Sequence, residues 1–152
     1  MSGKPEVDED HFSGADISCV LHATEDENNV LNAASETFSI PKDRFFFKRL
    51  DGHWGNPIIY LMALLDSKEA RTTASKIMLS LNPLERNHLK ESVHDLVDEK
   101  GNMYIRLDKQ GMCRGKINLS EFDSVRIKFR SVKTFRKTRA MPDYKVILSL
   151  DE

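Results

Sequence analysis

The sequence has few of the residues on which disulfide-rich and zinc-binding domains depend. Its two cysteines, Cys19 and Cys113, lie far apart, and neither belongs to a CxxC pair or a Cys/His spacing. This excludes a disulfide framework and a zinc finger. The longest apolar stretch, residues 57–65, is far shorter than the ~20 residues that cross a bilayer. The acidic start of the chain also lacks the apolar segment of a signal peptide. We therefore expect a cytoplasmic protein with no membrane contact.

The sequence also lacks the common catalytic motifs. It contains no GxGxxG, GxxxxGK[ST], HExxH or GxSxG pattern, and Cys113 has basic neighbours but no evident partner base. A metal or acid–base cluster of His22, Glu25, Asp26 and His53 is disfavoured, because no pattern brings the two histidines together and both carboxylates suit a helix start. We expect no metal, no cofactor and no catalysis. A hydrolase built on His22, Asp26 and His53 is the alternative.

The charges nearly cancel over the whole chain but are unevenly distributed along it. The 152 residues include 23 basic and 24 acidic side chains, which leaves a formal charge of -1. Residues 1–36 nevertheless contain one base, Lys4, among many acids, whereas residues 126–139 contain no acid. The bases of this second segment are Arg126, Lys128, Arg130, Lys133, Arg136, Lys137 and Arg139. Such asymmetry indicates a site for a polyanion near the C-terminal end.

Hydrophobic periodicity predicts an α+β domain with a mostly antiparallel sheet and helices packed on one face. A length of 152 residues suits one domain, which we place at residues 14–152 after a flexible acidic tail at 1–13. The expected strands are 15–23, 44–50, 57–65, 103–108, 125–130 and 144–150, and apolar residues on both faces of 57–65 indicate a covered central strand. Two expected helices begin at Thr24 and Asp66, each with a capping box. A third begins at Pro83 and ends near Gly101.

The strand 125–130 gives the clearest functional indication. Because side chains alternate across a sheet, Arg126, Lys128 and Arg130 share its outer face, roughly 7 Å apart. If 103–108 is the neighbouring strand, Tyr104 and Arg106 join that face. Basic side chains with an aromatic ring for stacking are typical of surfaces that bind single-stranded or irregular RNA. The alternative is an ordinary solvated sheet face.

Two loops add candidates. Between the strands 44–50 and 57–65, Gly52 and Gly55 flank His53 and Trp54, and the indole could stack on a base; Trp54 could equally cover the core. After the strand 103–108, Lys109 and Arg114 could contact phosphate. The alternative there is a charged hairpin in which Asp108 pairs with Lys109 or Arg106.

Three motifs resemble a known family. They are His22-Ala23-Thr24-Glu25-Asp26, Gly52-His53-Trp54-Gly55-Asn56-Pro57-Ile58 and Tyr104-Ile105-Arg106-Leu107-Asp108-Lys109-Gln110, the last preceded by the segment from Val97 to Asn102. Their order and spacing are similar to those of small archaeal proteins described as RNA-binding proteins or predicted exosome subunits, over roughly residues 16–130.

The resemblance implies an archaeal source, a fold like that of the ribosomal protein that binds 5S rRNA, and RNA binding without catalysis. It also implies an accessory role for the RNA-degrading exosome or in ribosome-related RNA metabolism. The acidic extension and the strand-like segment 144–150 depart from the family.

The leading hypothesis is therefore a non-catalytic RNA-binding protein. Its expected contacts are Arg106, Lys109, Arg126, Lys128, Arg130, Tyr104, Trp54 and His53. The alternative is a protein-interaction subunit whose basic sheet face docks an acidic partner or a second copy. The acidic tail could also screen the basic region within the same chain.

Overall fold

The computed structural model describes residues 12–52 and 56–131, and all structural statements below concern these residues. The expected strand 144–150, the tail residues 1–11, and both His53 and Trp54 lie outside the described residues.

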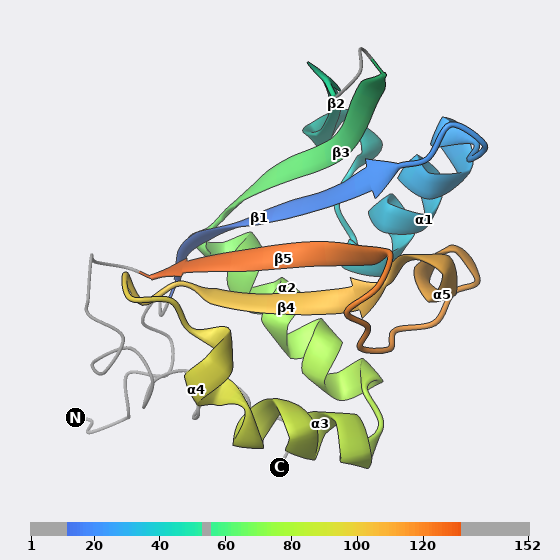
Figure 1. Ribbon diagram of the computed structural model, residues 1–152. Helices are drawn as coiled ribbons and strands as arrows, with labels where there is room; N and C mark the ends of the chain where they lie inside the picture. Colours follow the sequence, from blue (N-terminus) through green and yellow to red (C-terminus); the bar gives the residue numbers. More distant parts are fainter. Residues whose placement is uncertain (1–11, 53–55, 132–152) are drawn as a thin grey trace.

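Five strands form one antiparallel sheet in the order β2-β3-β1-β5-β4 (Figure 1). The strands are β1 (Phe12–Leu21), β2 (Phe45–Asp51), β3 (Pro57–Asp66), β4 (Met103–Asp108) and β5 (Ser124–Ser131). The helices are α1 (Glu27–Phe38), η2 (Lys42–Arg44), α2 (Ser67–Ser80), α3 (Pro83–Glu91), α4 (Val93–Leu96) and α5 (Lys109–Cys113). The predicted α+β class is confirmed.

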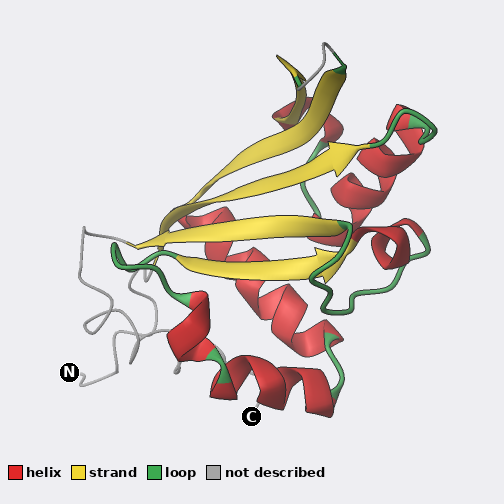
Figure 2. Cartoon of the chain, in the orientation of Figure 1, coloured by secondary structure: helices red, strands yellow, loops and turns green. Residues whose placement is uncertain are grey.

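The helices lie on one side of the sheet and along one edge. Figures 1 and 2 show α2 and α1 behind the sheet, with α3 and α4 beyond the edge strand β4. From Ala15 onward, odd-numbered residues of β1, β3, β4 and β5 point toward the helices and form most of the core with them, for example Ile17, Ile127 and Phe129. Phe12, before the register shift of β1, is also in the core. Even-numbered residues point to the opposite side, which we call the open face.

The first and third helices differ from the prediction. Asp26, rather than Thr24, caps α1 by accepting hydrogen bonds from the backbone of Asn28 and Asn29. Glu25 is not available for helix capping because it takes part in the ion cluster described below. The expected long helix after Pro83 is interrupted at Ser92, which separates α3 from α4, and Gly101 occupies a turn at φ 90° rather than a helix end.

Other capping predictions are confirmed. Asp66 and Glu69 form a reciprocal capping box at the start of α2, and Asn82 caps α3 with Pro83 at its first turn. The sheet begins earlier than predicted, since Phe12 is buried in β1. β3 lies inside the sheet, but its open face is only partly covered, because the Leu64 side chain is 52% exposed.

Candidate functional site

Two neighbouring strands bring four predicted site residues together on the open face. In the antiparallel register of β4 and β5, Tyr104 lies opposite Lys128, and Arg106 lies opposite Arg126. We call these four residues the basic strip. Like charges directly opposite each other destabilise a sheet, so the Arg106–Arg126 pair has an electrostatic cost that an anionic ligand would relieve. The condition under which Tyr104 and Arg106 join this face, that the two strands are neighbours, is met.

Tyr104 organises the cations of this strip. The guanidinium carbon of Arg126 lies 5.5 Å from the centre of the Tyr104 ring, and Nζ of Lys128 lies 6.0 Å from it. Both distances lie within about the 6 Å range of a cation–π contact. The Tyr104 hydroxyl donates to Oδ2 of Asp98 at 2.9 Å. Because the ring already contacts two cations, its geometry suits positioning them better than stacking on a base.

The contact between Asp98 and Tyr104 was not predicted, although Asp98 lies in the segment from Val97 to Asn102 that precedes the third motif. Its carboxylate also accepts hydrogen bonds from the backbone of Lys100 and Asn102 and from the Asn102 amide. Burial opposes ionisation, but these bonds together lower the pKa of Asp98. The sequence Asp-Glu-Lys-Gly-Asn is typical of a turn in which the aspartate side chain binds backbone N–H groups. This pattern could have indicated the role of Asp98.

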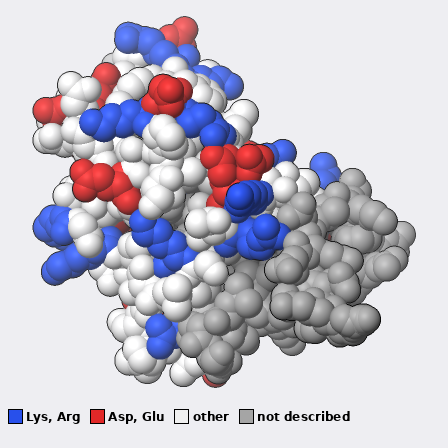
Figure 3. All heavy atoms as spheres, turned by 180° about the vertical axis from the view of Figure 1, so that it is seen from behind, with Lys and Arg blue, Asp and Glu red and all other residues white. Residues whose placement is uncertain are grey.

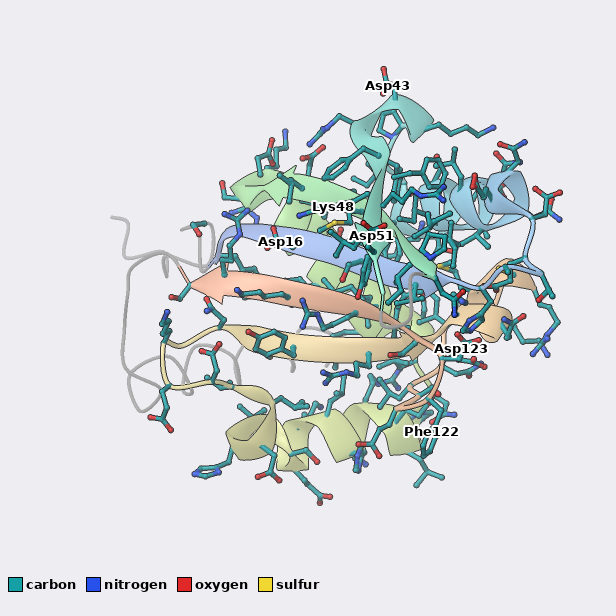
Figure 4. All side chains as sticks on the ribbon, turned by 45° about the horizontal axis from the view of Figure 1, so that its top comes forward. Asp16, Asp43, Lys48, Asp51, Phe122 and Asp123 are labelled. Carbon is teal, nitrogen blue, oxygen red and sulfur yellow. The ribbon has the colours of Figure 1, made fainter. Side chains whose placement is uncertain are left out.

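Arg130 lies at the end of the same face but has an internal partner. Its Nε lies 3.3 Å from Oδ1 of Asp16 on β1, and its terminal nitrogen lies 3.4 Å from the backbone oxygen of Leu65. Asp16 also lies directly opposite Lys128 in the β1–β5 register. Arg130 is thus less available to an anion than Arg106 or Lys128. Figure 4 shows Asp16 on the open face.

Lys109 is not a surface residue, which corrects its expected contact with phosphate. Its side chain is 0% exposed. Nζ donates to the backbone oxygen of Val20 at 2.6 Å and to Oε1 of Glu25 at 2.7 Å, and it lies 2.9 Å from Oδ1 of Asp123. Burial alone would lower the pKa of Lys109, but the two carboxylates raise it. The alternative of a pair with Asp108 is not found for Lys109 either, because α5 turns its side chain inward to Glu25 and Asp123.

Two further side chains complete this ion cluster, which we define as His22, Glu25, Lys109, Gln110 and Asp123. The Gln110 amide donates to Oε2 of Glu25 and Oδ2 of Asp123, each at 3.0 Å, and Nε2 of His22 lies 3.0 Å from Oδ1 of Asp123. Although burial opposes ionisation, the hydrogen bonds from Gln110, Lys109 and His22 lower the pKa of Asp123 to about 2. The cluster therefore joins two of the three sequence motifs in space.

The geometry of the cluster indicates a structural role. Of the residues in the hydrolase alternative, His22 contacts Asp123, whereas Asp26 caps α1, and His53 lies outside the described residues. Cys19 lies in the core, where burial raises its pKa to about 12. Among residues 12–52 and 56–131, no group of three or more His, Cys, Asp or Glu side chains is arranged so that it could hold a metal ion, and no helix there is long and apolar enough to cross a membrane.

The helix side of the molecule has a different charge pattern. Figure 3 views the molecule from behind the sheet and shows basic and acidic side chains interspersed. On the open face, by contrast, the basic strip places three cations on two adjacent strands. Within the part of the chain that the structure describes, the strip is thus a surface whose charge pattern suits an anionic ligand.

The comparisons with known proteins agree with this charge pattern. A family model described as RNA binding matches residues 15–131. The chain belongs to this RNA-binding family. It is 35% identical over 114 residues to RNA-binding protein PAB1135 of Pyrococcus abyssi, with 72% of this chain and 74% of the relative covered.

Solved structures of similar proteins have the same fold. Protein AF2318 of Archaeoglobus fulgidus is 26% identical and superposes with a TM-score of 0.76, covering 90% of this chain and 99% of its own. Protein SSO0741 of Sulfolobus solfataricus, also 26% identical, has a TM-score of 0.69 and covers 90% and 98%, respectively. The family match spans β1 to β5 and therefore includes both the basic strip and the ion cluster.

Proposed function

We propose that this member of the RNA-binding family binds RNA through the basic strip, as a binding protein rather than an enzyme. Arg106, Arg126 and Lys128 contact backbone phosphates, and Tyr104 holds Arg126 and Lys128 in position. The observation that carries the proposal is the unbalanced Arg106–Arg126 pair on the open face, in a chain that the RNA-binding family model matches.

The affinity of such a surface is electrostatic. Phosphate contacts release counterions, and three contacts to a single strand predict a slope of about −2 for the logarithm of the binding constant against the logarithm of the salt concentration. Phosphate contacts position RNA without reading its sequence. We therefore expect the strip to bind different sequences with similar affinity.

The test is a fluorescence-anisotropy titration of a labelled single-stranded RNA at about 50 to 300 mM salt. We expect the triple variant R106A/R126A/K128A to lose most of the binding and most of the salt dependence. The matched control is K42A/K68A/K116A, which removes the same charge from exposed lysines outside the strip and should retain the wild-type slope. Salt-independent binding, or equal losses in both triple variants, would contradict the proposal.

The cellular role of the RNA binding is inferred only from the resemblance of the three sequence motifs to the archaeal family. We propose an accessory role for the RNA-degrading exosome or in ribosome-related RNA metabolism. Co-purification of the full chain with exosome subunits or ribosomal particles, in nuclease-treated and untreated lysates, tests this role. Recovery of neither assembly would contradict it while leaving the RNA contact of the strip intact.

A second candidate function is docking of an acidic protein partner on the same face. It is favoured by exposed apolar side chains on the part of the open face that β1, β3 and β2 form, namely Val20, Leu64, Phe46 and Leu50. In this case the triple variant would lose a protein partner in pull-downs while wild-type protein failed to bind RNA at low salt.

A further inference from the structure

A groove at the edge of the sheet adjoins the basic strip. It lies where α3 and α4 face β4 and has a volume of about 610 Å³. The residues that line it include His88, Ser92, Asp95, Tyr104, Arg106 and Phe122. This volume is within the range of about 300–1,000 Å³ that is usual for small-ligand sites. Tyr104 and Arg106 belong to both the groove and the strip, so a ligand on one surface would extend directly to the other.

Phe122 is exposed to an unusual degree for an aromatic side chain. It is 84% exposed, and Figure 4 shows it on the loop before β5, beside α3. Aromatic rings usually supply buried area to a core or interface. A ring left in solvent at the mouth of a groove is therefore available to a ligand.

The backbone on both sides of Phe122 is firmly held. The Ser120 hydroxyl accepts from the Phe122 N–H at 3.2 Å and donates to the Phe122 carbonyl at 2.8 Å. Before this turn, the loop is attached to β4 by the Ser120 N–H, which donates to the Arg106 carbonyl at 3.1 Å. The Glu85 carboxylate on α3 accepts from the Leu119 N–H at 2.8 Å.

After Phe122, the ion cluster fixes Asp123. Asp123 has a φ of 47°, a left-handed conformation that is uncommon for residues other than glycine. Contacts with His22, Lys109 and Gln110 hold its side chain, and its carbonyl accepts from the Lys109 N–H at 3.1 Å. The cluster thus fixes the backbone next to Phe122 at the groove, which reduces the backbone entropy lost on binding.

We propose that this groove binds one unpaired nucleobase of an RNA strand whose phosphates lie on the basic strip, with Phe122 as the stacking platform. The proposal rests on the proposed function and extends it to single-stranded or looped RNA. Arg106 supplies the charge complementarity, since it would hold the phosphate next to the inserted base. Stacking on an aromatic ring tolerates any base, while His88, Ser92 and Asp95 offer hydrogen-bonding groups to the base edges.

The experiment compares F122A, F122Y and L84A in titrations with a labelled single strand and with the same strand annealed to its complement. We expect F122A to weaken binding of the single strand by about 5- to 150-fold, as lost base stacking does, without changing the salt slope. F122Y should retain binding, and binding of the duplex should be unaffected, since its bases remain paired. Leu84 is 81% exposed and lies outside the groove lining, so L84A is a matched control for loss of an exposed apolar side chain.

A second readout locates the base directly. Irradiation of a bromouridine-substituted strand bound to the wild-type protein should attach it to residues that line the groove, namely residues 119–122, Tyr104 or His88. Cross-links confined to other segments, or F122A binding as tightly as wild type, overturn the inference while the strip proposal stands. Loss of a protein partner in F122A with unchanged RNA binding also overturns it. Failure of the wild-type protein to bind any RNA instead defeats the proposed function itself.

Discussion

Nζ of Lys109 lies 2.9 Å from Oδ1 of Asp123, and this contact joins the start of α5 to the residue that precedes β5. Glu25, from the segment between β1 and α1, binds the same ammonium at 2.7 Å. One buried cation thus connects three segments that are far apart in sequence. Two carboxylates and one ammonium form the centre of the cluster, so its stability depends on the cation.

We expect K109M to destabilise the fold strongly. Methionine preserves most of the volume but leaves Glu25 and Asp123 facing each other without a cation. Breaking a buried ion pair by removing one partner costs about 3–5 kcal/mol. Urea unfolding followed by circular dichroism measures this difference in unfolding free energy. K116M, at an exposed lysine, should change stability by no more than about 0.5 kcal/mol. Equal midpoints for K109M and K116M would show that the cluster does not stabilise the fold.

Acid should weaken the cluster through Asp123. Its pKa is about 2 in the folded protein, compared with an ordinary value of 3.8, because Gln110, Lys109 and His22 bind the ionised form against the effect of burial. The unfolded state therefore binds protons first as pH falls. The stabilisation is complete above about pH 4 and is lost as the pH falls toward about 2.

The variant D123N isolates this contribution, and asparagine tolerates the left-handed backbone at this position. We expect D123N to be less stable than wild type at pH 7, with the difference decreasing between about pH 4 and pH 2 as Asp123 loses its charge. Urea midpoints at several pH values measure it. A difference that stays constant down to pH 2 would contradict the assigned role of the carboxylate.

The sequence predicted the basic strip well because its residues lie on two alternating strands. Alternation alone places Arg126 and Lys128 on one face and Val125, Ile127 and Phe129 on the other, and the structure confirms it. The order of strands could not be derived in this way. β1 lies between β3 and β5, and such long-range pairing leaves no local pattern in a single sequence.

The environment of Lys109 could not be predicted for a related reason. A lysine directly after a strand has the same local pattern whether it is exposed or buried. Its burial depends on Glu25 and Asp123, which lie 84 and 14 positions away and approach only in the folded protein. Phe122 was also missed, since a single aromatic residue between charged neighbours has no periodicity. The cap at Asp26 was misplaced because Thr24 and Asp26 are both typical capping residues.

The backbone at Gly14 should not accept a side chain. A Cβ added there would lie 2.5 Å from the backbone oxygen of Leu65 and 3.1 Å from the guanidinium carbon of Arg130. We expect G14A to lower the unfolding free energy by about 1–3 kcal/mol, as overpacking does, whereas S13A at the exposed neighbouring residue should be near neutral. Thermal or urea unfolding measures both variants. A G14A protein as stable as S13A would show that the backbones of β1 and β3 separate here at low cost and that the Arg130 side chain moves aside.

Removal of the acid beside the basic strip should strengthen RNA binding. Asp16 lies opposite Lys128 and pairs with Arg130 at 3.3 Å. In D16N, Arg130 becomes available as a fourth cation and the local negative charge is lost. Four phosphate contacts to a single strand predict a slope of about −3, compared with about −2 for three. Anisotropy titrations of D16N and D16N/R130A over the same salt range measure this change. The double variant should return to the shallower slope, because the additional contact is assigned to Arg130. A contradicting result would also be informative. If D16N binds RNA no more tightly than wild type at low salt, the phosphates do not approach the β1 side of the strip. The RNA path would then follow β4 toward the groove at Phe122.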